Sequence, residues 1–167
     1  MLTTMTTRAA VAAVATGLLW AGFAATAEAK IEPQVGIGGI ELEMTVAKVM
    51  KKKGKPDRDR VVSDEDVGEQ RELRYGKTTA LFAGAGDDAP LIGVITKSRR
   101  ERTDGGSGVG TKEEKLREDL RRLRCRMIAG ERHCLLGRLR NGRTVTDFVI
   151  SDRTGRVTRV TVAIITD

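Results

Sequence analysis

The stretch from Gly105 to Lys112 has the residue types of a phosphate-binding loop. Gly105 and Gly110 have the GxxxxG spacing, and Thr111 and Lys112 follow directly. In a P-loop the lysine comes first and the hydroxyl second, so that they reach the phosphates and the magnesium ion. Here that order is reversed, and the charged segment Ser98–Asp104 precedes the loop instead of a buried strand. We therefore expect no nucleotide binding and no cofactor.

Other side chains that could perform catalysis are few. His133 is the sole histidine, and no serine or free thiol lies near it in sequence. A Ser-His-Asp arrangement built from distant residues stays open. Neighbouring carboxylates occur at Asp64-Glu65-Asp66 and at Asp87-Asp88, but both groups lie in charged, turn-like stretches. Solvated loops explain them better than an acid/base pair does, so we predict that the protein is not an enzyme.

The two cysteines, Cys125 and Cys134, are expected to form a disulfide. A two-residue turn at Ala129-Gly130 would place them opposite each other on neighbouring strands. Closing so short a loop contributes roughly 2–3 kcal/mol by the chain-entropy estimate. The alternative, a Cys/His metal site with His133, lacks further ligands, and we expect no metal.

The first 29 residues are typical of a secretory signal peptide. Arg8 precedes an apolar run from Ala9 to Ala25, and Ala27-Glu28-Ala29 provides a cleavage site before Lys30. Thr16, Gly17 and Gly22 interrupt the run, which argues against a membrane span. No cysteine lies near the cleavage site for a lipid anchor. We expect an exported protein, whether extracellular, periplasmic or associated with the cell wall.

The basic composition predicts an anionic partner. The chain has a formal net charge of +7, and the predicted signal peptide carries one Arg and one Glu, so its removal leaves this charge unchanged. Export argues against nucleic acid as the target, and only Tyr75, Phe82 and Phe148 remain as aromatic residues for base stacking. An unidentified protein or an anionic envelope component is the expected partner.

The chain contains an internal repeat. Gly36–Thr45 leads into the predicted helix Val46–Lys53, and Gly105–Thr111 leads into the predicted helix Lys112–Leu123. Apolar stripes of helical spacing are formed by Val46, Val49 and Met50 and by Leu116, Leu120 and Leu123. Thr45 and Thr111 are the expected N-caps, and Glu114 completes a capping box with Thr111.

Each helix is followed by short runs with a period of two, which predicts strands. The first four are expected near Arg58–Ser63, Gln70–Tyr75, Thr78–Ala83 and Leu91–Lys97, and the second four near Arg124–Ile128, Arg132–Leu139, Arg143–Ile150 and Arg156–Ile165. The predicted fold class is α+β, with two tandem repeats that each pack a short helical segment on a four-stranded antiparallel sheet. Their bounds are 30–100 and 111–167, and 101–110 is the linker and glycine-rich segment between them.

The last two strands have a clear predicted register. A three-residue loop ending at Gly155 places Ile150 opposite Thr158, Phe148 opposite Val160, and Thr146 opposite Val162. The predicted buried face then contains Phe148, Ile150, Val160, Val162 and Ile164. The opposite face contains Arg143, Val145, Asp147, Val149, Arg159 and Thr161.

The first copy also contains a short motif that ends in a glycine and a proline. Its residues are Ile40, Leu42, Met44, Thr45, Val49 and the run Lys53-Gly54-Lys55-Pro56. This pattern resembles the opening motif of β-lactamase-inhibitory-protein-like (BLIP-like) domains and of BamE-type small lipoproteins of outer-membrane assembly, although Glu43 stands where the motif has glycine. The resemblance implies a secreted tandem-repeat fold that binds proteins through the open face of a sheet.

Two sets of residues are candidates for binding. The expected protein-binding residues are Arg74, Tyr75, Arg143, Asp147, Arg159 and Thr161, with Tyr75 as the aromatic anchor. The expected polyanion-binding residues are Lys48, Lys51, Lys52, Lys53 and Lys55 on and after the first helix. We therefore predict a secreted, non-catalytic, inhibitor-like protein, and the alternative is a basic protein that binds anionic wall polymer, lipid or assembly partners in the cell envelope.

Overall fold

The computed structural model describes residues 30–64 and 68–166. The predicted signal peptide and two of the clustered carboxylates, Glu65 and Asp66, lie outside the described residues. The first elements in chain order are β1 (Ile31–Glu32), β2 (Gly36–Ile37), β3 (Ile40–Glu41), α1 (Val46–Lys53), β4 (Arg58–Asp64), β5 (Gly68–Tyr75), β6 (Thr78–Ala83) and β7 (Leu91–Thr96). They are followed by α2 (Glu113–Asp119), β8 (Arg124–Ile128), β9 (Glu131–Gly137), β10 (Thr144–Ile150) and β11 (Val157–Ile164).

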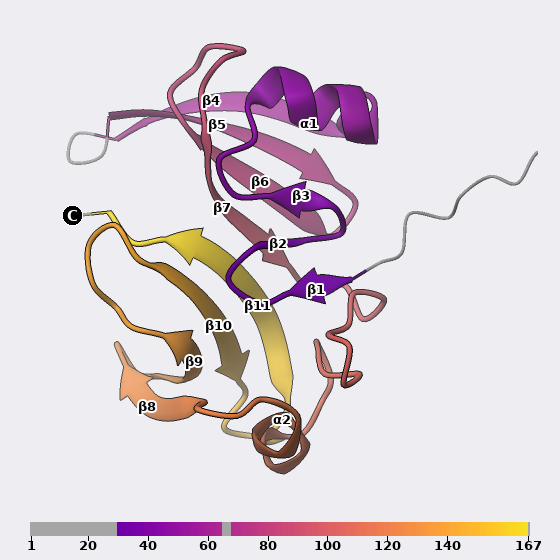
Figure 1. The fold of residues 1–167 in the computed structure, drawn as a ribbon, viewed down its shortest axis with the longest axis vertical. Coiled ribbons are helices and arrows are strands. Elements are labelled where there is room, and N and C mark those ends of the chain that lie inside the picture. Colours follow the sequence, from indigo (N-terminus) through magenta and orange to yellow (C-terminus); the bar gives the residue numbers. More distant parts are fainter. Residues whose placement is uncertain (1–29, 65–67, 167) are drawn as a thin grey trace, which may run out of the picture.

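Eight of the strands form one antiparallel sheet in the order β4-β5-β6-β7-β11-β10-β9-β8, and β1, β2 and β3 form a second, three-stranded sheet (Figure 1). The predicted fold class is therefore wrong: the protein is mostly strand, and it does not consist of two helix-on-sheet repeats with separate four-stranded sheets. Strands β7 and β11 pair from Thr96–Val160 to Gly93–Ala163. This pairing satisfies backbone groups that two separate sheets would leave open at their edges.

The eight predicted strands agree with β4 to β11 to within two residues at each end. The predicted pairs Phe148–Val160 and Thr146–Val162 are confirmed. Ile150, however, pairs with Val157 and not with Thr158, because the register shifts between Val149 and Ile150. A β-bulge of this kind adds one residue to one strand and moves each later pair.

The hydrophobic core lies on one face of the large sheet. Alternate strand residues point to this face, among them Leu73, Ala80, Phe82, Val94, Phe148, Val160 and Val162, which are all fully buried. The elements that cover them are α1, α2 and the small sheet, as Figure 1 shows. The covering side chains are Val46 and Val49 from α1, Leu116 from α2, and Ile31, Ile37 and Ile40 from β1 to β3. We call this side of the large sheet the covered face.

The two helices begin differently from one another. Thr45 caps α1 as predicted, since its side chain accepts a hydrogen bond from the Lys48 amide. The predicted capping box at Thr111 is wrong, because α2 starts after Lys112 and has no side-chain cap. The Thr111 carbonyl instead accepts a hydrogen bond from the Val157 amide, and the Thr111 hydroxyl accepts one from the Gly108 amide. These contacts hold Thr111 against the start of β11, and the helix begins one residue later.

The disulfide between Cys125 and Cys134 is confirmed. The two cysteines are directly opposite each other on β8 and β9. Ala129 and Gly130 form the turn between these strands with φ values of 47° and 82°, as the two positive values of a type I′ hairpin turn require. The disulfide belongs to the covered face, beside Glu113 of α2.

Glu113 connects α2 to the large sheet. Its carboxylate accepts hydrogen bonds from Arg132 Nε at 2.6 Å and from Arg132 Nη2 at 2.8 Å. Arg117 Nη2 of the same helix donates to it at 2.9 Å. The guanidinium of Arg132, and then that of Arg117, lower the pKa of Glu113 to about 2. Charge-assisted bonds of this geometry anchor the helix over the disulfide.

Removing the disulfide is expected to lower the free energy of unfolding by roughly 2–3 kcal/mol, because the cross-link restricts the unfolded chain. The measurement is urea denaturation of the oxidised wild type and of a Cys125→Ala/Cys134→Ala variant. Thiol labelling of the unfolded, unreduced wild type serves as the control and should find no free cysteine. Two reactive thiols in that sample would contradict the disulfide.

Replacing Glu113 by Gln should destabilise the protein by about 1 kcal/mol near neutral pH, because the partly exposed ion pair with Arg132 is lost. The folded-state pKa is depressed, so this stabilisation is complete above the usual value of 4.5 and disappears as the pH falls toward about 2. Denaturation curves across this range measure the difference between wild type and Glu113→Gln. The exposed neighbour Glu114→Gln is the control. A Glu113→Gln deficit that does not shrink with falling pH would contradict this role.

Candidate functional site

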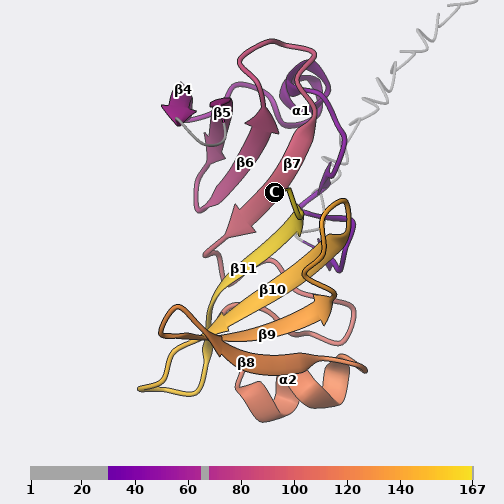
Figure 2. The ribbon, with the colours of Figure 1, turned by 90° about the vertical axis from the view of Figure 1, so that its left-hand side faces the viewer.

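The face of the large sheet opposite the core is a candidate binding surface, which we call the open face. Figure 2 shows α1, α2 and the small sheet away from this face, and no described helix or strand packs on it. One cross-strand row runs over it from one end of the sheet to the other. The row consists of Arg58, Arg74, Thr79, Ile95, Thr161, Asp147, Leu135 and Arg124. The pairing of β7 with β11 makes this surface continuous.

A basic hollow of about 500 Å³ lies on the open face over strands β4 to β7. Its lining residues, Arg58, Arg60, Glu72, Arg74, Lys77, Thr79, Ile95 and Lys97, include five cations and one carboxylate. Arg60 pairs with Glu72. Arg58, Lys77 and Lys97 form no ion pair with any residue in the described ranges. The hollow therefore keeps an unneutralised positive charge.

The strand register places two of the positive charges of the hollow side by side, which lowers the stability of the sheet. Arg58 lies directly opposite Arg74 on the neighbouring strand, and like charges in such a pair destabilise a sheet. Arg74 Nε donates to the Gly76 carbonyl at 2.9 Å, which fixes the guanidinium without neutralising it. An anion bound in the hollow would relieve this repulsion.

The other half of the open face has a polar cluster, which consists of Glu131, His133, Asp147 and Arg159. His133 Nδ1 and Asp147 Oδ2 are 2.7 Å apart, and Arg159 Nη2 donates to Glu131 Oε2 at 3.2 Å. Burial raises the pKa of Asp147, and this effect is larger than the lowering by His133. The second carboxylate oxygen of Asp147 is buried and has no hydrogen-bond partner among the described residues. The cluster is thus an internally paired, partly desolvated group.

The cluster does not have the geometry of a nucleophilic site. His133 Nε2 faces Glu131 Oε2 at 3.9 Å, and no described hydroxyl group is hydrogen-bonded to this ring. A serine hydrolase would require a hydroxyl there. Glu113, Cys125 and Cys134 are close enough together to suggest a metal site, but both sulfur atoms are in the disulfide and a metal binds the thiolate form.

The structure brings together three of the predicted protein-binding residues. Asp147, Arg159 and Thr161 lie on the open face of β10 and β11, with Asp147 opposite Thr161. Arg74 lies on the same face in the basic hollow, and Arg143 is exposed in the turn before β10.

Tyr75 does not lie on the open face. Its ring packs against the core on the covered face, and its hydroxyl donates to the Gly54 carbonyl at 3.2 Å. Burial raises its pKa, and Asp59 adds to this effect. The position differs from the expected one because neighbouring strand residues point to opposite faces, so that Arg74 and Tyr75 cannot share one surface.

The predicted polyanion-binding lysines are only partly free. Lys52 Nζ pairs with Glu41 at 3.0 Å, and Lys53 Nζ donates to the Gly38 carbonyl at 3.1 Å. Both therefore connect α1 to the small sheet. Lys48, Lys51 and Lys55 are exposed, and they remain available to solvent on and after α1.

Four cations of the basic hollow were not among the predicted site residues: Arg58, Arg60, Lys77 and Lys97. A signal for them was present in the sequence, because Arg58 and Arg60 alternate with Asp59 and Val61 along one predicted strand. Assigning the faces of the first four strands, as was done for the last two, would have aligned Arg58 and Arg60 with Arg74.

Replacing Asp147 by Asn is expected to raise the free energy of unfolding near neutral pH by about 1 kcal/mol, because the buried charge is removed while an acceptor for His133 remains. The folded-state pKa of Asp147 is raised, so the wild type loses stability as the pH rises through that pKa and the two proteins become equal at low pH. Urea denaturation at about pH 7 and about pH 3 measures this, with the exposed Asp152→Asn as control. An Asp147→Asn variant that is less stable at neutral pH would contradict it.

The described helices include none that is long and apolar enough to cross a membrane. No family model matches the chain, and no curated protein matches it in sequence. A cysteine-rich secretory protein from Staphylococcus aureus is 11% identical over 79% of this chain, with a TM-score of 0.47. An extracellular protein from Bacillus anthracis that contains an SCP domain is 10% identical over 74% of this chain, with a TM-score of 0.48. The chain spans 47% and 44% of these two structures, and similarity at this level assigns no function.

Proposed function

We propose that this is an exported, non-catalytic binding protein that holds an acidic surface of a partner protein against the open face of its sheet. The observation that carries the proposal is the basic hollow, where Arg58, Lys77 and Lys97 lie together without an ion-pair partner among the described residues. The disulfide between Cys125 and Cys134 is the kind of bond that persists outside the cytosol, and it supports export together with the predicted signal peptide.

The chemistry of the hollow favours carboxylate groups as ligands. Arginine presents a planar set of donors that matches a carboxylate, and Arg58 and Arg74 stand side by side on paired strands. Ile95 and Thr79 also line the hollow and provide less polar surface that a partner side chain can cover. Partial exclusion of water strengthens each charge pair made there.

The open face recognises its partner by charge and not by aromatic side chains. The three aromatic residues of the described chain, Tyr75, Phe82 and Phe148, all pack in or against the core. The sequence motif resembles BLIP-like domains, which bind proteins through an open sheet face, and the proposal keeps this inhibitor-like mode while replacing aromatic anchors with arginine and lysine.

A second candidate function is binding to an anionic polymer or lipid of the cell envelope. The observation that favours it is the exposure of Lys48, Lys51 and Lys55 around α1, away from the open face. Contacts of these flexible, solvated side chains with a polyanion would weaken steeply as the salt concentration rises.

Two charge-matched variants distinguish these functions. Arg74→Glu/Lys97→Glu changes the hollow, and Lys51→Glu/Lys55→Glu changes the helix surface by the same charge. The tagged 30–167 protein and both variants are incubated with culture medium and envelope extract, washed at rising salt, and the retained material is identified by mass spectrometry. We expect one protein to survive the high-salt wash and the hollow variant to bind it at least tenfold more weakly.

The helix variant should retain that protein at the wild-type level. Loss of binding in the helix variant alone, with an anionic polymer or lipid released at low salt, would replace this proposal by the envelope function. Equal loss in both variants would show that net charge, and not the hollow, determines binding.

A further inference from the structure

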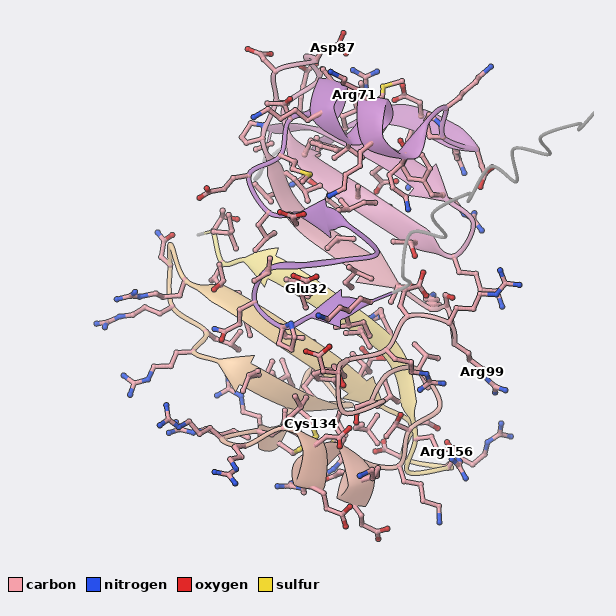
Figure 3. The ribbon with its side chains drawn as sticks, turned by 45° about the vertical axis from the view of Figure 1, so that its right-hand side comes forward. Glu32, Arg71, Asp87, Arg99, Cys134 and Arg156 are labelled. Atoms are coloured by element: carbon pink, nitrogen blue, oxygen red, sulfur yellow. A yellow bond between two sulfur atoms is a disulfide. The ribbon has the colours of Figure 1, made fainter. Side chains whose placement is uncertain are left out.

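Three arginines surround a pocket that is separate from the open-face hollow. Arg99 and Arg102 come from the connection between β7 and α2, and Arg156 comes from the turn before β11. Figure 3 shows Arg99 and Arg156 projecting from the same side of the molecule. The pocket has a volume of about 360 Å³ and is lined by Arg99, Arg102, Val109, Gly110, Thr111 and Arg156, none of which lines the basic hollow.

The arginines converge on Gly110 and Thr111. Arg156 Nη1 donates to the Gly110 carbonyl at 2.8 Å, and Arg102 Nη1 donates to the Thr111 hydroxyl at 3.1 Å. A Cβ atom built at Gly110 would lie 3.8 Å from Arg99 Nε. Three guanidinium groups from two separate segments thus lie around the same two residues.

The local backbone maintains this arrangement. Gly110 has a φ of 94°, a region that residues with a side chain rarely adopt. The Gly110 amide donates to the Val157 carbonyl at 2.7 Å, which fixes the glycine-rich segment against the start of β11. The segment and the turn that bears Arg156 are therefore held together by main-chain bonds.

None of the described carboxylates pairs with these arginines. The pocket lining contains no Asp or Glu, and none of the three arginines forms an ion pair with a residue in the described parts of the chain. Arg102 and Arg156 each donate one hydrogen bond to a neutral oxygen. A guanidinium has five N–H donors, so further donors are available for a ligand. Neighbouring guanidinium groups repel one another, and a bound anion would remove this repulsion.

We propose that Arg99, Arg102 and Arg156 form a binding site for a phosphate-class oxyanion. A tetrahedral dianion can accept hydrogen bonds from several guanidinium groups at once, and arginine pairs with phosphate oxygens in a bidentate manner. Inorganic phosphate and the phosphate of a lipid headgroup share this chemistry. This site differs from a P-loop because its donors are arginine side chains. The Thr111-Lys112 order, which argues against a P-loop, therefore does not argue against this site.

The first test is a titration of the 30–167 protein with inorganic phosphate at constant ionic strength, followed by NMR of the arginine Nε–H groups. Saturable shifts of Arg99, Arg102 and Arg156, with a Kd in roughly the millimolar range, are the expected result. Shifts that grow linearly with phosphate, or that spread equally over all exposed arginines, would overturn the proposal.

The second test compares two double variants that lose the same charge. Arg99→Gln/Arg156→Gln removes two pocket arginines, whereas Arg100→Gln/Arg153→Gln removes exposed arginines of the same two segments that do not line the pocket. We expect phosphate affinity to fall about tenfold or more in the pocket variant, which corresponds to about 1.4 kcal/mol, and to stay within twofold in the control. An equal loss in both variants would overturn the proposal. The NMR titration uses the wild type, so its result still tests the proposal if a variant proves unstable.

A vesicle assay identifies the source of the phosphate group. Co-sedimentation with phosphatidylglycerol vesicles that inorganic phosphate displaces, and that the pocket variant lacks, assigns a lipid headgroup. Phosphate binding without vesicle binding assigns a small phosphate-bearing ligand. Both outcomes retain the site, and neither depends on the partner-binding function of the open face.

Discussion

Pairing between β7 and β11 is the interaction on which the open face depends. Each half of the chain supplies four consecutive strands, and these two strands would otherwise end two separate sheets. Their contact brings Gly93 beside Ala163 on the open face, where a Cβ atom built on Gly93 would lie 3.5 Å from that of Ala163. This junction lies between the basic hollow on strands β4 to β7 and the polar cluster on strands β9 to β11.

The two faces of this sheet divide the chemistry of the chain between them. The covered face takes the aromatic side chains, the disulfide and the apolar side chains of α1 and α2, and it supplies the hydrophobic stabilisation. The open face receives alternate residues of the same strands, and these combine apolar side chains such as Ile95, Val145 and Leu135 with arginine, lysine and carboxylate groups. The proposed recognition by charge therefore agrees with the use of the aromatic residues in the core. The paired polar cluster adds a region where buried charge lowers stability.

Local pattern was enough to predict the strands, the disulfide hairpin and the cap at Thr45, because each depends on residues within one turn or one pair of strands. The join between β7 and β11 was not predictable in this way, since it connects segments far apart in sequence and leaves no periodic mark. Thr111 shows the same limit: its sequence fits a capping box, but a bond from the distant Val157 amide holds it outside the helix. For the site, Asp147, Arg159 and Thr161 were placed correctly from one hairpin, whereas Tyr75 was placed on the wrong face and most of the hollow was missed.

Both outer strands of the large sheet carry arginines at alternate positions on the open face: Arg58 and Arg60 on β4, and Arg124 and Arg126 on β8. If a second copy added its β8 to the free edge of β4, arginines would meet arginines along the new pair of strands. Repulsion between these arginines would oppose the edge-to-edge association that open strands invite. This repulsion is electrostatic, and dissolved salt screens it over a short distance. The colloidal behaviour of the protein is therefore governed by the same arginines that give the open face its charge, and solutions of low ionic strength should favour the separate molecule.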